Sequence, residues 1–316
     1  MKRVKKIAGL VGFWAVLLAI LIGLSHLAKP VREIYNINGV KDKIKSVQAE
    51  KDNSIDVVFL GDSETYSAFN PLQIWKEHGY TSYILGTSAQ RLCDSYEILK
   101  ETCEKQSPSV VVLEANCFYR YAGISPNPED KEINALGKYL PIFYYHNRWK
   151  NIIDENSFDT SSQKMERVRK GFKYRDNVEP YKNGEWMQPS DDTEEFADLV
   201  EDYLVKIKEL CDEKEMTLVV TSVPAPANWN SARHNSVQNW ADKNNIEYYD
   251  MNTTVDEIGI DWHTDSRDSG NHMNYKGAVK VTSYFGELLD RKFDFPDRRE
   301  DSYYDNWNDA VETSGL

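Results

Sequence analysis

The sequence predicts an α/β protein built on a five-stranded, mostly parallel sheet. Short β-rich apolar runs alternate with amphipathic helical patterns from residue 53 to residue 293. This alternation is typical of parallel sheets that carry helices on both faces. The chain has 316 residues, 41% of them hydrophobic, and no internal repeat, which favours one principal domain. In such sheets, functional sites lie at the carboxyl ends of the strands.

Each predicted strand is a short run rich in β-branched or other apolar residues, bounded by turn-forming or charged residues. The five runs are residues 56–60, 82–85, 110–113, 217–221 and 246–249. The clearest helix spans residues 192–214, where apolar residues recur on one face behind an acidic start. A final helix is expected at residues 275–291.

Two segments depart from this alternation. Residues 118–189 hold eight aromatic residues between Phe118 and Trp149, among Pro, Gly and charged residues. We expect a large insertion near the strand ends, whose rings either stack on sugar faces or pack onto the main core. The acidic and aromatic C-terminal segment, residues 294–316, either packs back as an extra helix through Trp307 or stays mobile.

The N-terminal segment predicts a membrane anchor. Residues 7–27 contain no Asp, Glu, Lys or Arg, and at about 1.5 Å per residue such a helix reaches across the ~30 Å core of a bilayer. Basic residues within residues 1–6 place that tail in the cytoplasm and the rest of the chain outside the cell membrane. Residues 28–52 are then a juxtamembrane linker before the α/β domain, residues 53–293. The alternative is a cleaved signal peptide, which the long apolar run and the poor cleavage site disfavour.

Charge and residue spacing exclude several classes of partner. A net charge of -13 disfavours nucleic acid, since that binding needs Lys and Arg to neutralise phosphates. No GxGxxG follows the first strand and no GxxxxGK[ST] occurs in the chain, so no nucleotide cofactor is expected. The histidines and the four cysteines lack the spacing of a metal site. The sequence therefore predicts no cofactor, no metal, and buried free thiols.

Candidate catalytic groups lie in two segments far apart in the chain. Ser63 follows the first strand within VVFLGDSETYSAFNP, and His272 follows Asp265 and Asp268 just before the last helix. A serine nucleophile needs a base, an acidic group that orients the base, and hydrogen-bond donors for the oxyanion. A loop can bring either carboxylate to the imidazole. The alternative is that Ser63 is only the N-cap of the next helix.

Two motifs resemble the first and last sequence blocks of the SGNH, or GDSL-type, hydrolase superfamily. They are FLGDSETYSAFNP and DSGNHMNYKGA, and the resemblance covers essentially the whole soluble portion. It implies a flavodoxin-like three-layer α/β/α fold. It also implies that Ser63 is the nucleophile, His272 the general base and acid, and Asp268 the orienting carboxylate. The superfamily spacing puts that carboxylate at position 269, which is Ser269 here, so Asp265 stays as the alternative acid.

The middle blocks of the superfamily pattern are less complete. The resemblance implies an oxyanion hole made of the Ser63 and Gly86 backbone N–H groups and the Asn116 side chain. Gly86 lies in YILGTSAQ after the second strand, and Asn116 lies in VVVLEANCFYR after the third. Glu114 and Ala115 precede Asn116, where the usual pattern has a glycine. An acidic residue therefore stands near a site that must stabilise negative charge.

An anchor followed by an SGNH-like domain resembles the proteins that work beside membrane-bound O-acyltransferases. The D-alanyl transfer protein of teichoic-acid modification and alginate-acetylating proteins are examples. The resemblance implies transfer of an acyl group, with acetyl expected, from acyl-Ser63 to a cell-envelope or exported polysaccharide, with a membrane-bound O-acyltransferase as partner. Two alternatives stay open: a membrane-tethered carbohydrate esterase, and a non-catalytic glycan-binding subunit of an envelope complex.

Overall fold

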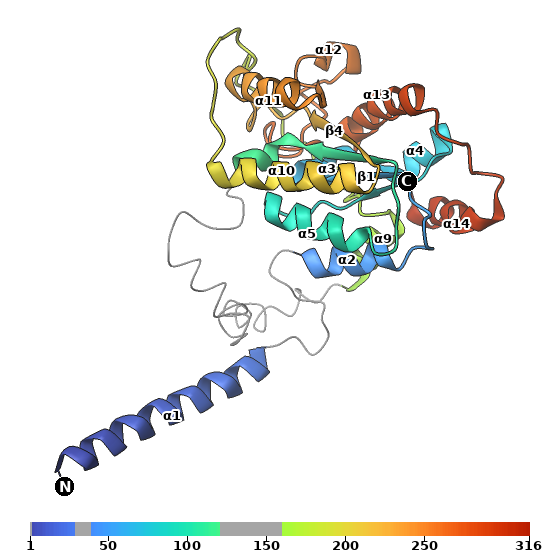
Figure 1. Ribbon diagram of the computed structural model, residues 1–316. Helices are drawn as coiled ribbons and strands as arrows, with labels where there is room; N and C mark the ends of the chain where they lie inside the picture. The colour runs from blue at the N-terminus through green and yellow to red at the C-terminus, as the bar shows by residue number, and fades with distance from the viewer. Residues whose placement is uncertain (1, 29–38, 121–159) are drawn as a thin grey trace. The chain divides into compact units, whose positions relative to one another are not determined.

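The computed structural model describes residues 2–28, 39–120 and 160–316. Its centre is a five-stranded sheet in which all neighbouring strands are parallel, in the order β2-β1-β3-β4-β5 (Figure 1). The predicted strands are confirmed, and each boundary agrees within one residue. The strands are β1 Val57–Leu60, β2 Ser82–Ile84, β3 Val110–Glu114, β4 Thr217–Ser222 and β5 Glu247–Asp250.

Helices surround the sheet on both faces. They are α3 Ser63–Ala68, α4 Pro71–His78, α5 Leu92–Thr102, α10 Asp198–Glu213, α11 Ser231–Asn244, α12 Val255–Ile258 and α13 Tyr275–Phe293, together with the 3₁₀ turn η1 Ala115–Tyr119. Helix α13 packs with α3 and α4 over one face, where Phe59 and Phe285 share a buried cluster. Helices α5 and α10 pack together on the opposite side of the sheet (Figure 1). The three-layer α/β/α fold and the final helix are therefore confirmed.

The N-terminal helix α1, Lys2–Ala28, is apolar along most of its length. Its window Lys6–Ser25 has a mean hydropathy of 2.6. Among the helices that the structure describes, it alone is long and apolar enough to cross a membrane. A helix of this kind near an N-terminus serves as a membrane anchor or as a signal sequence. The segment predicted as a linker contains helix α2, Val40–Gln48.

The helix predicted at residues 192–214 begins only at Asp198, so its predicted start is wrong. The residues before it bind helix α11 instead. The Glu194 N–H donates to Ser236 Oγ at 2.9 Å, and its carboxylate accepts two hydrogen bonds from Arg233, each of 3.0 Å. These contacts to another element outweigh the weak helical preference of an acidic start.

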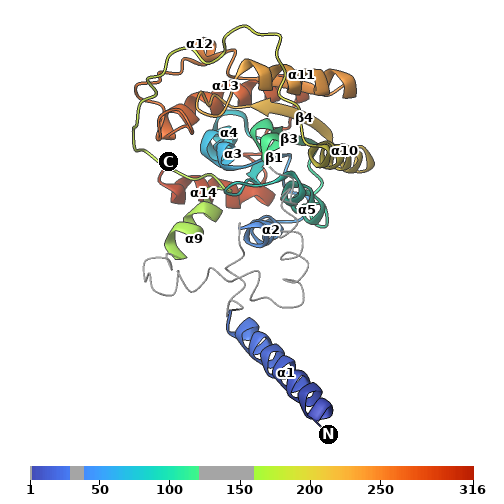
Figure 2. The same ribbon diagram turned by 90° about the vertical axis from the view of Figure 1, so that its left-hand side faces the viewer.

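A belt without helix or strand, residues 171–197, leads from helix α9, Thr160–Val168, to α10 (Figure 2). The Lys173 N–H donates to the Tyr66 carbonyl of α3 at 3.0 Å. Further along, the Glu179 N–H donates to the Ser266 carbonyl, in the loop before α13, at 3.0 Å. The belt therefore binds both the segment that follows β1 and the segment that precedes the last helix.

Only the ends of the predicted insertion, residues 118–189, fall within the described part of the chain. Phe118 and Tyr119 belong to η1 at its start. Phe118 is buried, and its ring centroid lies 6.0 Å from that of Trp240 in α11. Residues 121–159, with the other six of the eight aromatic residues, lie outside the described residues. Of the two described rings, Phe118 packs onto the core, which agrees with one of the two predicted alternatives.

All four cysteines lie within the described residues and are free. Cys117 and Cys211 are buried as expected, whereas Cys93 and Cys103 are only half-buried. Burial raises the pKa of Cys93 and of Cys211 to about 12. Because the thiolate is the reactive form of cysteine, these two thiols are poor nucleophiles.

The C-terminal segment packs back onto the domain as helix α14, Asp305–Ser314, so of the two alternatives the extra helix is observed. Trp307 is fully buried. Its ring centroid lies 5.6 Å from that of Trp75 in α4, and the Lys170 ammonium group lies 4.5 Å from the ring centroid of Trp307. This side chain therefore helps to hold α14 on the domain.

Trp307→Ala is expected to lower the free energy of unfolding by about 3–5 kcal/mol, the usual cost of removing a buried aromatic side chain. Urea unfolding of the full-length protein, followed by tryptophan fluorescence and circular dichroism, measures the change. The exposed Tyr303 is the control position, since Tyr303→Ala empties no buried space. Equal stability of the two variants would contradict the docking role of Trp307.

Candidate active site

Ser63 lies at the sharp turn from β1 to α3. The fully buried strand β1 is followed by Gly61, whose φ of +151° lies in the region that favours glycine. A Cβ on Gly61 would collide with Thr65 Oγ1 and lie 2.8 Å from Glu114 Cβ. The close approach of these residues therefore requires glycine. The turn leaves Ser63 as the first residue of α3, with 7% of its surface exposed.

Asp62, and not Ser63, caps helix α3. Asp62 Oδ1 accepts the Glu64 N–H at 3.0 Å, and its Oδ2 accepts from the Arg120 guanidinium. The alternative that Ser63 is only a helix cap is therefore wrong, because its neighbour fills that position. Among the described residues, the Ser63 hydroxyl has no hydrogen-bond partner.

The two other predicted oxyanion donors flank the Ser63 turn. Gly86 follows β2, and a Cβ there would lie 2.9 Å from the Asp62 carbonyl oxygen, so the Gly86 backbone touches the turn. Its N–H has no partner within the described part of the chain. Asn116 follows β3, and its Nδ2 donates one hydrogen bond to Asp62 Oδ2 at 3.1 Å, which leaves its second N–H unused. The ends of three neighbouring strands thus bring these groups together.

His272, in the loop before α13, forms two hydrogen bonds with Asp268. Its Nδ1 lies 2.6 Å from Asp268 Oδ2, and its backbone N–H donates to Asp268 Oδ1 at 2.7 Å. Burial alone would raise the pKa of Asp268, but the hydrogen bonds and charge of His272 hold it below its usual value. With Nδ1 donating to this carboxylate, Nε2 is the basic ring atom. It is buried and has no hydrogen-bond partner among the residues that the structure describes.

Asp265, the alternative acid, forms no hydrogen bond or ion pair with His272 among the described residues. Its Oδ2 lies 2.6 Å from Lys280 Nζ and accepts the Asp261 N–H at 2.7 Å. The Asp265 side chain is buried beneath the start of α13. Of the two carboxylates that the sequence left open, Asp268 is the one that lies on the imidazole.

No hydrogen bond joins the Ser63 hydroxyl to His272 Nε2 in the described residues. Their segments are linked instead by Asn228, in the loop after β4. Its Nδ2 donates to Glu64 Oε1 at 2.6 Å and also contacts Oδ1 and the carbonyl oxygen of Asn271. Sequence reasoning missed both Asn228 and Glu64 as site residues. The available signals were that Asn228 follows the fourth strand and that Glu64 follows the serine.

Two buried carboxyl groups lie beside the Ser63 turn. Glu64 and Glu114 are 1% and 2% exposed. Burial, and then the negative charge of Asp62, raises the pKa of both groups well above the usual value. These shifts favour the neutral acids, so the negative charge expected at Glu114 is suppressed. Its Oε2 accepts the Asn116 N–H at 3.1 Å and so helps to orient η1.

The raised pKa of Glu114 predicts a stability that falls with rising pH. Unfolded Glu titrates near about pH 4.3, so the stabilisation is complete below that pH and is lost as the pH rises through the higher folded pKa. Glu114→Gln keeps an acceptor for Asn116 and cannot ionise, so we expect it to flatten this fall. Urea unfolding of both proteins between about pH 5 and about pH 9 measures the difference. Parallel curves would contradict a neutral Glu114.

Comparison with known proteins finds similarity among solved structures. No protein-family model matches the sequence, and no curated protein matches it. A structure from Bacteroides fragilis described as a putative acylhydrolase shares 13% identity, covering 80% of this chain and 95% of that chain, with a TM-score of 0.39. A GDSL-like lipase from Bacteroides thetaiotaomicron shares 12% identity over 80% and 98%, with a TM-score of 0.41. At these values the similarities support no conclusion about activity.

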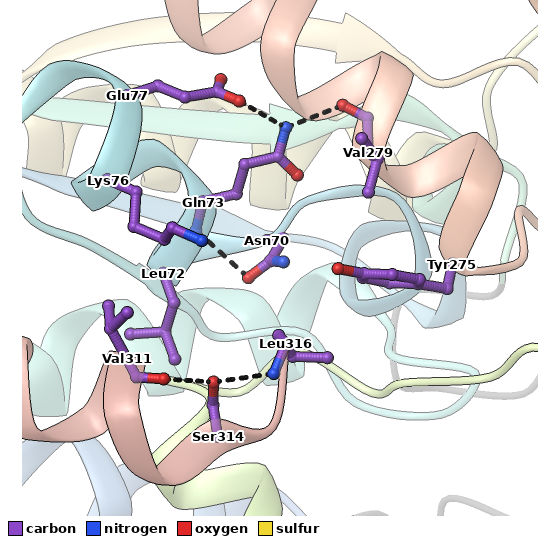
Figure 3. A pocket seen from close by; sticks show the side chains of 10 residues that line it. All are labelled: Asn70, Leu72, Gln73, Lys76, Glu77, Tyr275, Val279, Val311, Ser314 and Leu316. Atoms are coloured by element: carbon purple, nitrogen blue, oxygen red, sulfur yellow. Dashed lines mark hydrogen bonds between the residues drawn. The ribbon is translucent and has the colours of Figure 1, made fainter.

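A separate cavity of about 200 Å³ lies between α4, the start of α13 and the end of α14 (Figure 3). Gln73 reaches across it from α4, and its Nε2 donates to the Val279 carbonyl at 2.9 Å and to Glu77 at 3.0 Å (Figure 3). None of the predicted site residues lines this cavity. It is therefore not part of the candidate serine site.

Proposed function

We propose that this chain is a serine-dependent acyl-ester enzyme in which Ser63 accepts the acyl group. The observation that carries the proposal is the His272–Asp268 pair, which leaves a buried basic Nε2 with no partner in the described part of the chain. A base of this kind takes the proton of a serine hydroxyl within its reach. Catalytic hydrogen bonds are often long before substrate binds. We therefore propose that the distance between the Ser63 hydroxyl and His272 Nε2 shortens when substrate binds.

In the first step, Ser63 Oγ attacks the carbonyl carbon of an acyl ester, and its proton passes to His272 Nε2. The Ser63 and Gly86 N–H groups and the unused N–H of Asn116 stabilise the oxyanion. The ester C–O bond then breaks, and the leaving oxygen takes the proton from His272, which leaves the acyl group on Ser63. Asp268 keeps the imidazole oriented and stabilises its charged form.

In the second step, we propose that a hydroxyl of a cell-envelope or exported polysaccharide accepts the acyl group, with acetyl as the group transferred. His272 takes the proton of that hydroxyl, and the acceptor oxygen bonds to the acyl carbon. The bond from that carbon to Ser63 Oγ then breaks, and Ser63 Oγ takes the proton back from His272. Helix α1 supports this choice, since as an anchor it would hold the domain beside a membrane-bound O-acyltransferase that supplies the acyl group. Water in place of the hydroxyl would make the protein a tethered carbohydrate esterase.

The test is the intact mass of the full-length protein in detergent after incubation with an activated acetyl ester. An acetyl adduct on the native protein that is absent from Ser63→Ala would support the acyl-enzyme. Discharge to an added oligosaccharide would support transfer, whereas discharge at the same rate in water alone would support the esterase. If the protein forms no adduct and consumes no ester even with the membrane-bound O-acyltransferase present, the enzyme proposal is overturned. That result would favour the glycan-binding subunit.

A further inference from the structure

We propose that Asn228 is a positioning residue for the Ser63 reaction. Its side-chain amide fixes the segment that carries Ser63 against the loop that carries His272. The inference rests on the proposed serine chemistry, and it adds a residue that lies in neither of the two motifs.

The first argument is the geometry of the amide itself. Asn228 lies between β4 and α11, and its Nδ2 contacts two chain segments at once: Glu64 Oε1 at 2.6 Å, and the Oδ1 and carbonyl oxygens of Asn271. Glu64 is the direct neighbour of the nucleophile, and Asn271 is the direct neighbour of the base. Of these partners, Glu64 is buried, and a hydrogen bond to a buried group is strengthened by the low local dielectric. A single side chain therefore bridges the segment that carries Ser63 and the loop that carries His272.

The second argument is that a hydrogen bond to its backbone carbonyl holds Asn228 in place. Arg233 of α11 donates from Nη1 to the Asn228 carbonyl at 2.6 Å. The same guanidinium binds both oxygens of Glu194 in the belt, each at 3.0 Å, and lies 4.3 Å from the ring centroid of Tyr119 in η1. The Asn228 loop is thus tied to the belt and to the 3₁₀ turn that carries Asn116. The Asn228 side chain therefore couples the positions of the belt and η1 to the segments that carry Ser63 and His272.

The third argument concerns the charge of Glu64, which accepts the hydrogen bond from the Asn228 amide. Asp62, Glu114 and Asp268 are the carboxylates that act on Glu64, and Arg120 is the nearby cation. Burial, followed by the charges of the carboxylates, raises the pKa of Glu64 and favours its neutral form. A neutral carboxyl group accepts the Asn228 amide without placing a second negative charge beside Asp268. Glu64→Gln keeps both the shape and the neutrality of this group.

The test compares variants of the full-length protein in detergent, by turnover of an activated acetyl ester and by the rate at which a fluorophosphonate labels Ser63. We expect Asn228→Ala to lower kcat on the order of 10²-fold, the cost of misplacing reacting groups, and to leave KM unchanged. Asn235→Ala is the matched control, since Asn235 donates from the same amide type to the Ser190 and Asp192 carbonyls of the belt. It should keep the native kcat.

A second comparison separates positioning from a merely structural role. Asn228→Leu removes the amide donor to Glu64 at nearly the same side-chain size and should lower kcat as Asn228→Ala does. Asn228→Gln keeps an amide that can donate to Glu64. We expect Asn228→Gln to retain more of the native kcat than Asn228→Leu.

The outcomes distinguish this inference from the proposed function. A native protein that neither turns over ester nor labels at Ser63 would overturn the proposed function and this inference with it. A native protein that labels, with Asn228→Ala labelling at the native rate, would overturn the inference alone. Where Asn228→Ala does not fold, the other two variants decide: turnover by Asn228→Gln no better than that by Asn228→Leu would overturn the positioning role.

Discussion

Replacing Ser63 with alanine is expected to lower kcat on the order of 10⁶-fold, because the remaining oxyanion donors and bound substrate supply only residual catalysis. The fold should persist, since the Ser63 hydroxyl has no partner among the described residues and Asp62 caps the helix. Turnover of an activated acetyl ester by the full-length protein measures the loss. Thermal unfolding of the same samples measures whether the domain is intact.

Ser67→Ala is the matched control for this experiment. Ser67 lies on the same short helix, and its hydroxyl donates to the Ser63 carbonyl at 2.6 Å. Its removal costs one hydrogen bond, about 1 kcal/mol of stability, without removing the nucleophile. Turnover that survives Ser63→Ala but falls with Ser67→Ala would transfer the catalytic role away from Ser63.

The strands could be predicted from sequence because the sheet is buried on both faces. Val57–Leu60 and Val110–Glu114 are continuous runs in which every residue is buried, bounded by glycine or serine and charged residues. Such runs are distinctive of parallel strands. Because the carboxyl ends of β1, β2 and β3 meet at one edge, the order of the strands also brings Ser63, Gly86 and Asn116 together.

The features that could not be predicted from the sequence depend on contacts between residues that are far apart in the chain. Asn228 and Glu64 are separated by 164 positions, and no local pattern predicts that pairing. The raised pKa of Glu64 follows from its burial and then from the charge of Asp62, neither of which the sequence around Glu64 specifies. The start of α10 was missed for the same reason, since Glu194 forms its contacts with α11. Local periodicity predicts elements, whereas side-chain contacts decide where they end and which residues meet.

Asp268→Asn is the second substitution with a large expected effect. An asparagine amide at this position donates to His272 Nδ1 and so moves the ring proton to Nε2, the atom that must act as the base. We therefore expect a fall in kcat on the order of 10⁴-fold with little change in KM. Steady-state kinetics of the full-length protein with an activated acetyl ester measures both values.

Asp265→Asn makes the same chemical change, but we expect it to lower stability and to leave kcat unchanged. Asp265 is the buried partner of Lys280 and of the Asp261 N–H, and no hydrogen bond joins it to His272 in the described residues. Its substitution weakens the packing beneath α13, so the unfolding midpoint should fall while kcat per folded molecule is kept. Because the two variants differ only in which carboxylate is neutralised, a large loss of kcat in Asp265→Asn alone would show that the loop rearranges during the reaction. The orienting role would then pass from Asp268 to Asp265.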